Sequence, residues 1–189
     1  MNPTPPGLYT YVRSPIGRLL LCGDEHRLSG LYTPPASENP DLLSGRRGSD
    51  SAFGPVREQL EEYFAGERVA FDVPIDLDAA TPFRRNVWSA LLEIPYGATV
   101  SYGELARQLG VPNAARAVGA ANGSNPISII VPCHRVIGSG GGLTGYAGGL
   151  ERKRYLLRHE AEVLRRSPHE PRSSRQHVLQ CAPAGHDLE

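Results

Sequence analysis

One cysteine in this chain has the neighbours that a reactive thiol needs. Cys133 is followed directly by His134 and Arg135, within the run VPCHRV. Cationic neighbours favour the thiolate, which is the nucleophilic form of cysteine. Because adjacent side chains of an extended chain point to opposite faces, the sequence alone does not pair Cys133 with His134. The alternative is a buried structural cysteine at the end of a core strand, since free cysteine is among the most buried residue types.

Other residues offer weaker chemistry. Cys22 and His26 have the spacing of two zinc ligands, but no second close pair follows, and structural zinc usually takes four ligands. Residues 140–145 match the dinucleotide fingerprint G-x-G-x-x-G by letters only, because no helix of a βαβ unit begins there. Cys181 lies in a polar segment without such neighbours. We therefore expect neither a metal nor a cofactor.

Composition and charge limit the partners of this chain of 189 residues. Its 20 basic residues balance 20 acidic ones, so the overall field indicates neither nucleic acid nor membrane. Residues 100–160 differ, because seven basic and three acidic side chains leave an excess of positive charge, which suits a polyanion or a solvated helix face equally well.

Location is also constrained by the sequence. No run of 18 apolar residues and no signal-peptide pattern is present, so we expect no membrane partner and no secretion. Three widely spaced cysteines are typical of a reducing compartment. We therefore expect a cytoplasmic protein.

Turn residues divide the first part of the chain into short strands. The runs LYTYV, RLLLCG and RLSGLYT, within residues 8–33, are separated by turns about ten residues apart, which predicts an antiparallel meander. Residues 34–52 are rich in Pro, Ser and Gly and predict a loop. Apolar residues at helical spacing predict a helix over 53–65 with Gly66 as its C-cap. The alternation in FDVPIDLD predicts a further strand. We expect a small sheet-and-helix domain over residues 1–80.

A second, helical part begins at Thr81 and Pro82, a good N-cap followed by a good first helical residue. Ser101 and Glu104 form a capping box for a second helix, and Asn113 can cap a third, AARAVGAAN. Two short helices joined by a three- or four-residue turn are a helix-turn-helix candidate.

The rest of the second part surrounds Cys133. The run ISIIVP predicts a strand that leads into it, and a glycine-rich loop over 138–149 follows. A basic helix, ERKRYLLRHE, reaches Glu160. Apolar periodicity then fades, so we expect a frayed helix end and a disordered tail over 166–189. The second domain is expected over 81–165.

Four motifs of the second part occur in the order and spacing of a known family. The runs IPYGATVSYGELA, AARAVGAANGSNP, IIVPCHRVIG and LTGYAGGLERKRYLLRHE together resemble the O6-alkylguanine-DNA alkyltransferases over residues 81–160. The runs SPIG and YFAGE resemble that family's N-terminal domain. The resemblance implies an α+β fold, with a small antiparallel β-sheet domain followed by a helical domain that contains a helix-turn-helix.

The resemblance also implies direct-reversal DNA repair. An alkyl group, such as methyl, passes irreversibly from guanine O6 to Cys133, with O4-alkylthymine as a second candidate substrate. Because the thioether product is stable, each molecule is expected to act once. By motif position, His134 and Glu160 activate Cys133 through a bridging water, and Asn125 braces the turn. Tyr102 faces the base and can donate a proton or a hydrogen bond to the leaving guanine.

A base inside a duplex is unreachable and must be flipped out. By motif position, Arg116 replaces the flipped-out base in the stack. It lies on a slim helix that enters the minor groove. The other DNA-binding candidates are Ala115, Ala117, Gly119 and Asn122. The candidate pocket residues are Val136, Tyr146, Ala147 and Gly148. The expected partner is double-stranded DNA bearing O6-alkylguanine, bound by a monomer.

Two other functions fit parts of the sequence. A lesion sensor would bind alkylated DNA without reacting, but such relatives replace the cysteine, and Cys133 is present. A thiol hydrolase could use Cys133 with His134, and it would turn over a small ester or peptide many times.

Overall fold

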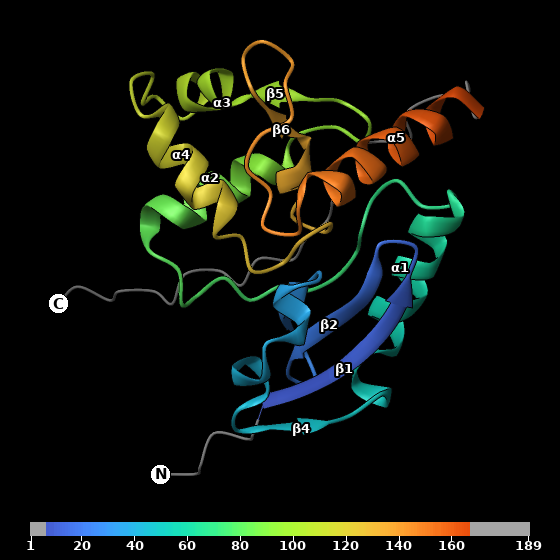
Figure 1. Cartoon of the computed structure of the whole chain (residues 1–189). Helices are drawn as coiled ribbons and strands as arrows, with labels where there is room; N and C mark the ends of the chain where they lie inside the picture. The colour runs from blue at the N-terminus through green and yellow to red at the C-terminus, as the bar shows by residue number, and fades with distance from the viewer. Residues whose placement is uncertain (1–6, 167–189) are drawn as a thin grey trace, which may run out of the picture.

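The computed structural model describes residues 7–166 and shows a sheet with one helix packed beside a group of four helices (Figure 1). Within these residues, no helix is long and apolar enough to cross a membrane. The tail that we expect over 166–189 lies outside the described residues, apart from Arg166.

The sheet is mixed. Strands β1 (Gly7–Ser14), β2 (Gly17–Gly23) and β3 (Leu28–Tyr32) form the predicted antiparallel meander. A fourth strand, β4 (Arg46–Gly48), pairs in parallel with β1, which gives the order β3-β2-β1-β4. The predicted loop over 34–52 therefore contains one short parallel strand at the edge of the meander, which the sequence does not indicate, because three residues with two arginines carry no strand signal.

One helix and one irregular segment complete this part. Helix α1 (Gly54–Ala65) ends at Gly66, whose φ of 80° is left-handed, so the predicted helix and C-cap are confirmed. Residues 71–78 do not form the predicted strand, since only an isolated bridge joins Ile75 to Leu28. The apolar residues of this segment are buried. Their alternation therefore reflects contact with the core rather than pairing within a sheet.

Capping residues start two helices where the sequence predicts. Helix α2 (Pro82–Leu92) follows Thr81, whose hydroxyl oxygen accepts a hydrogen bond from a backbone N–H of the first turn. Helix α3 (Tyr102–Gln108) begins with the predicted capping box, in which Ser101 and Glu104 each accept from the other's backbone N–H. The sequence thus fixes the entry of both helices locally.

Helix α4 (Ala115–Gly123) packs against α2 and α3. Asn113 does not cap it, because this residue lies inside a backbone turn over 111–114 and no side chain bonds to the helix start. The connection to α3 is therefore longer than the expected three or four residues. The indole N–H of Trp88, on α2, donates to the carbonyl of Ala121 at 2.8 Å and holds α4 in place.

The run ISIIVP is a buried turn rather than the predicted strand. Ile129 has a φ of 72°, and Ile127 makes only an isolated bridge, to Leu31. A short apolar run indicates burial, but it does not say whether the backbone is extended.

Three elements then position the chemistry. A 3-10 turn, Cys133–Arg135, leads into β6 (Val136–Ile137), which pairs in parallel with β5 (Val100–Ser101). Helix α5 (Leu150–Arg166) packs against that turn. It continues to Arg166 rather than fraying after Glu160, because Val163 still packs in the core.

Candidate active site

Cys133 begins the 3-10 turn, and only 4% of it is exposed. Asn125 braces the preceding segment, because its amide donates to the carbonyl of Val131 at 2.8 Å and its amide oxygen accepts from the N–H of Ile127 at 3.0 Å. Burial raises the pKa of the Cys133 thiol, against the opposing effects of Asn125 and the positive charge of Lys153. The thiol therefore needs a base to become a strong nucleophile.

His134 and Glu160 form a buried pair, with Nε2 of the imidazole 2.8 Å from Oε1 of the carboxylate. Arg135 donates Nε and Nη2 to the same carboxylate, each at 3.0 Å, and the N–H of Gly97 donates at 2.9 Å. Burial alone would raise the pKa of Glu160, but His134 and Arg135 outweigh it and hold this pKa well below its usual range. The carboxylate is therefore ionised and only accepts hydrogen bonds.

The proton position on His134 follows from this pairing. Nε2 must carry the hydrogen, because Glu160 can only accept. Nδ1 is buried and has no hydrogen-bond partner among the described residues. Burial lowers the pKa of His134, and the charge of Glu160 opposes that effect. The site therefore holds a neutral imidazole whose second nitrogen is a base, on the same short turn as Cys133.

Lys153 is a buried charge beside the site that sequence reasoning missed. Its ammonium donates to the carbonyl of Val136 at 2.5 Å and to that of Thr144 at 2.7 Å. These bonds tie the glycine-rich loop to β6. The sequence does contain a signal for it, because the buried residues of α5 recur at i, i+3, i+7 and i+10. They are Lys153, Leu156, Glu160 and Val163.

Tyr102 begins α3 and reaches the same loop. Its hydroxyl donates to the carbonyl of Thr144 at 3.2 Å, and the ammonium of Lys153 lies 5.9 Å from the centre of its ring. Burial raises the pKa of this phenol. Tyr102 therefore remains a proton donor at neutral pH.

Asn122 differs from its expected place on a DNA-facing surface. Only 1% of it is exposed, and its amide donates to the carbonyl of Cys133 at 3.3 Å. It belongs to the inner face of α4 and supports the cysteine turn. The carbonyl of Cys133 accepts from this amide and from the backbone N–H of Val136, so hydrogen bonds on both sides hold the turn in place.

The other expected pocket residues lie in the glycine-rich loop. The hydroxyl of Tyr146 is buried and has no hydrogen-bond partner in the described part of the chain. Ala147 is exposed, whereas Gly148 is buried. A Cβ atom at Gly148 would lie 2.4 Å from Oγ1 of Thr33, so only glycine lets the loop approach the first domain this closely.

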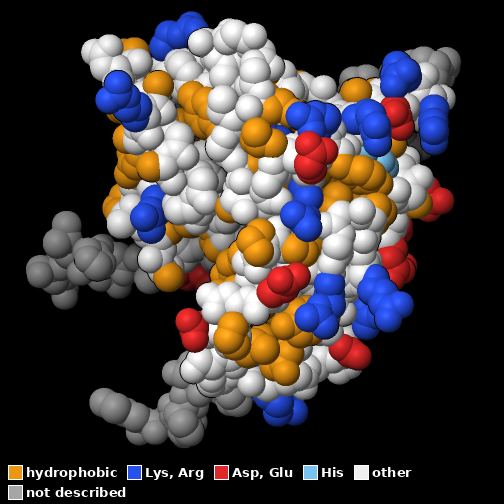
Figure 2. Space-filling view, viewed as in Figure 1, with side chains coloured by type: hydrophobic (Ala, Val, Ile, Leu, Met, Phe, Trp, Pro, Cys, Tyr) orange, Lys and Arg blue, Asp and Glu red, His pale blue; other side chains and the backbone are white. Residues whose placement is uncertain are grey.

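The outer face of α4 carries the remaining DNA-binding candidates. Arg116 and Ala117 are exposed, and Ala115 and Gly119 are half-buried. Arg116 makes no hydrogen bond or ion pair with any described residue. On the face shown in Figure 2, Lys and Arg side chains are dispersed, and several of them lie beside Asp or Glu side chains.

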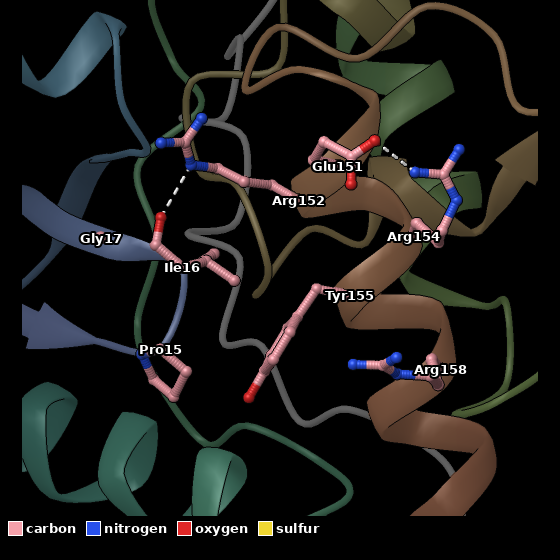
Figure 3. A pocket seen from close by; sticks show the side chains of 8 residues that line it. All are labelled: Pro15, Ile16, Gly17, Glu151, Arg152, Arg154, Tyr155 and Arg158. Carbon is pink, nitrogen blue, oxygen red and sulfur yellow. Dashed lines mark hydrogen bonds and ion pairs between the residues drawn. The ribbon is translucent and has the colours of Figure 1, made fainter.

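A separate groove of about 480 Å³ lies between the β1–β2 turn and α5 (Figure 3). Nε of Arg152 reaches across it and donates to the carbonyl of Ile16 at 2.7 Å. Arg154 is paired with Glu151 at 2.5 Å. None of the predicted site residues lines this groove, so its arginines lie outside the candidate active site.

Comparisons with known proteins agree with this architecture. The model of the 6-O-methylguanine DNA methyltransferase DNA-binding domain matches residues 82–162, and that of the family's ribonuclease-like domain matches residues 8–77. A methylated-DNA–protein-cysteine methyltransferase of Mycolicibacterium paratuberculosis is 53% identical over 79% of this chain and 89% of its own length. One from Shigella flexneri is 48% identical over 81% of this chain and 95% of its own length.

Solved structures from Mycobacterium tuberculosis are also similar. Its O6-methylguanine methyltransferase has a TM-score of 0.79 and 50% identity, covering 87% of this chain and 96% of that one. The OGT of that organism in complex with DNA has a TM-score of 0.77 and 51% identity, covering 82% and 94%. The fold and the site define a two-domain α+β protein with a helix-turn-helix and a buried cysteine centre. The chain belongs to the 6-O-methylguanine DNA methyltransferase family.

Proposed function

We propose that this protein repairs alkylated DNA by moving the alkyl group from O6 of guanine to Sγ of Cys133. One observation carries the proposal. The bond between His134 Nε2 and Glu160 leaves Nδ1 of His134 as a base on the turn that holds Cys133. The names of the relatives, and the DNA bound to the similar structure, support the same reaction.

The reaction balances with the groups at the site. Nδ1 of His134 accepts the thiol proton of Cys133 through one water, and Glu160 stabilises the imidazolium that forms. The thiolate attacks the alkyl carbon, so an S–C bond forms as the C–O bond to guanine breaks. The electron pair goes to O6 of the leaving guanine, and the hydroxyl of Tyr102 donates a hydrogen bond to it. The proton on His134 balances the charge of the guanine anion, and it passes through solvent to the base once the guanine leaves the site. The thioether is stable, so each molecule acts once.

The outer face of α4 binds double-stranded DNA in this proposal. Arg116 fills the space of the flipped nucleotide, and the small residues Ala115, Ala117 and Gly119 let the helix lie close to the minor groove. Val136, Tyr146, Ala147 and Gly148 surround the extruded base, and the Lys153 bonds fix the loop that carries three of them.

The finer features of the proposal have separate support. The two family models end and begin at residues 77 and 82, which supports a domain boundary near 80. The three cysteines support a reducing compartment such as the cytoplasm. O6-alkylguanine is the proposed lesion, with O4-alkylthymine as the second candidate, and the protein acts as a monomer.

Turnover tests the proposal against its alternatives. The protein is mixed with an excess of duplex containing O6-methylguanine, and repaired duplex is counted per protein chain. One repair event per chain is the expected result. Many events per chain, or hydrolysis of a small ester, would indicate a thiol hydrolase, and tight binding without repair would indicate a lesion sensor.

A further inference from the structure

The sheet domain reaches the catalytic carboxylate through one tyrosine. The hydroxyl of Tyr63, near the end of α1, donates to Oε1 of Glu160 at 2.9 Å. The backbone carbonyl of Tyr63 accepts from Nε2 of His159 at 2.7 Å. A single residue of the first domain is therefore bonded to two successive residues of α5. The link between Arg152 and Ile16 in Figure 3 joins the same domains at the start of α5, but it does not touch the carboxylate.

Packing fixes the position of this tyrosine. Tyr63 is completely buried, and the centre of its ring lies 5.4 Å from that of Phe71, 6.0 Å from that of Tyr96 and 5.2 Å from that of His159. Just beyond it, a Cβ atom at Gly66 would lie 2.9 Å from Cγ2 of Val163. The end of α1 thus packs closely on α5, and the Tyr63 hydroxyl has little freedom to leave its bond.

The direction of the bond is fixed by chemistry. Burial raises the pKa of Tyr63 well above its ordinary value, and the neighbouring charge of Glu160 adds to this effect. The phenol therefore keeps its proton and donates it. Oε1 of Glu160 accepts from Tyr63, from Nε2 of His134 and from Nη2 of Arg135. Tyr63 and His134 consequently share one oxygen atom.

We propose that Tyr63 is a positioning residue for alkyl transfer, which orients the Glu160 carboxylate and tunes how strongly it holds the His134 imidazole. The first domain then contributes a functional group to the site instead of serving only as a structural support. This inference rests on the proposed function, because it concerns the base of that reaction.

Removing only the hydroxyl has a defined consequence. With one donor fewer, Oε1 of Glu160 becomes a stronger acceptor, so protonated His134 is stabilised and the pKa of its imidazole rises. More of the base is then protonated at a mildly acidic pH. The other titratable and charged groups around this pair stay in place. They are Arg135, Lys153, Cys133, Tyr96 and, against the ring of Tyr63, His159.

The test compares Tyr63→Phe with Tyr96→Phe. Tyr96 is a matched control, because its ring contacts that of Tyr63 and its buried hydroxyl has no hydrogen-bond partner among the described residues. The alkylation rate with free O6-benzylguanine is measured from pH 5 to pH 8. For Tyr63→Phe, the midpoint of the acidic limb moves up by about half to one pH unit, which lowers the rate roughly three- to tenfold at pH values below both midpoints. For Tyr96→Phe, the midpoint stays where it is.

Two further measurements separate a failure of this inference from a failure of the proposed function and from a loss of packing. Replacing Tyr63 by 3-fluorotyrosine keeps the core fully packed and makes the phenol a stronger hydrogen-bond donor. The midpoint of the acidic limb therefore moves to lower pH. Titrating the His134 imidazole by NMR reads the same shift without any substrate. If the unmodified protein does not react, the proposed function fails, and the NMR titration still tests Tyr63. Equal midpoints for all variants, or equal shifts for Tyr63→Phe and Tyr96→Phe, would overturn the inference.

Discussion

The inner and outer sides of the candidate site are built in opposite ways. On the inner side, Glu160 accepts five hydrogen bonds from Tyr63, Gly97, His134 and Arg135, and it has no exposed surface. On the outer side, Arg116 is exposed and makes no hydrogen bond or ion pair with any residue that the structure describes.

Desolvation explains the difference. A buried charge costs several kcal/mol unless it is paired, so the inner groups must find their partners when the chain folds. An exposed arginine loses little by waiting for a ligand, and it can then contact phosphate or enter a base stack. The comparison teaches that substitutions inside should affect stability and reaction together, whereas substitutions outside should affect only reaction on duplex DNA.

The largest effect is expected for Glu160→Gln. The substitution leaves Arg135 buried without its counter-charge, so we expect a loss of about 3–5 kcal/mol in the free energy of unfolding. Denaturant unfolding measures this loss, and the alkylation rate should fall with it. Glu162→Gln, on the exposed face of the same helix, is the control and should change stability by less than about 0.5 kcal/mol. Similar losses for both variants would remove the distinction between the inner and outer sides.

Arg116→Ala should impair only the reaction that depends on the outer side, which is repair within duplex DNA. We expect repair within duplex to slow roughly 10- to 100-fold, because the flipped-out state loses the side chain that fills the stack. Reaction with free O6-benzylguanine should keep its rate, since a free base needs no flipping. Single-turnover rates on both substrates measure the contrast. The control is Arg158→Ala, which removes an exposed charge from α5. A matched loss on both substrates would place Arg116 in the support of the pocket.

Acid should lower the stability of the folded protein through the buried groups of the inner side. The pKa values of Glu160 and His134 are lower in the folded protein than their ordinary values of 4.5 and 6.5. The unfolded chain therefore binds more protons, and stability falls as pH drops below about 6.5 and again below about 4.5. Melting temperatures between pH 8 and pH 3 measure this slope. Glu160→Gln should flatten it below about pH 4.5, where Glu160 itself takes up a proton on unfolding, and an unchanged slope in that range would contradict the assignment.

The smallest effect is expected at the start of α3. Ser101→Ala removes the capping bond to the N–H of Glu104, which should cost about 1 kcal/mol of stability. Because Tyr102 is the next residue, the rate with free base reports whether helix entry also positions its hydroxyl. Ser101→Asp keeps an N-cap oxygen and should restore stability. Loss of stability in both variants would show that the hydroxyl is needed for something other than capping.

Much of this architecture is predictable because its signals are local. The Thr81 cap, the capping box at Ser101 and the C-cap at Gly66 are each decided within a few residues of the chain. The cysteine motif likewise stands in one continuous run. Such features need no knowledge of what packs against them.

The parts that escaped prediction depend on distant contacts. Tyr63 meets Glu160 from 97 positions away, and nothing near either residue in the sequence indicates that bond. The sequence around Lys153 is typical of a solvated basic helix face, and the burial of this residue depends on the packing of α5 against the cysteine turn. The run ISIIVP indicated burial correctly, but its turn depends on Asn125, whose amide bonds replace those of a sheet. Tertiary context decides these features.

Intact-mass analysis tests the central claim most directly. The protein is incubated with a duplex containing O6-methylguanine, and the modified residue is located by peptide mapping. The account predicts a gain of one methyl group per chain, on Cys133, with none on the buried Cys22 and none in Cys133→Ala. A methyl group on Cys22, or repaired DNA with no gain in protein mass, would contradict it.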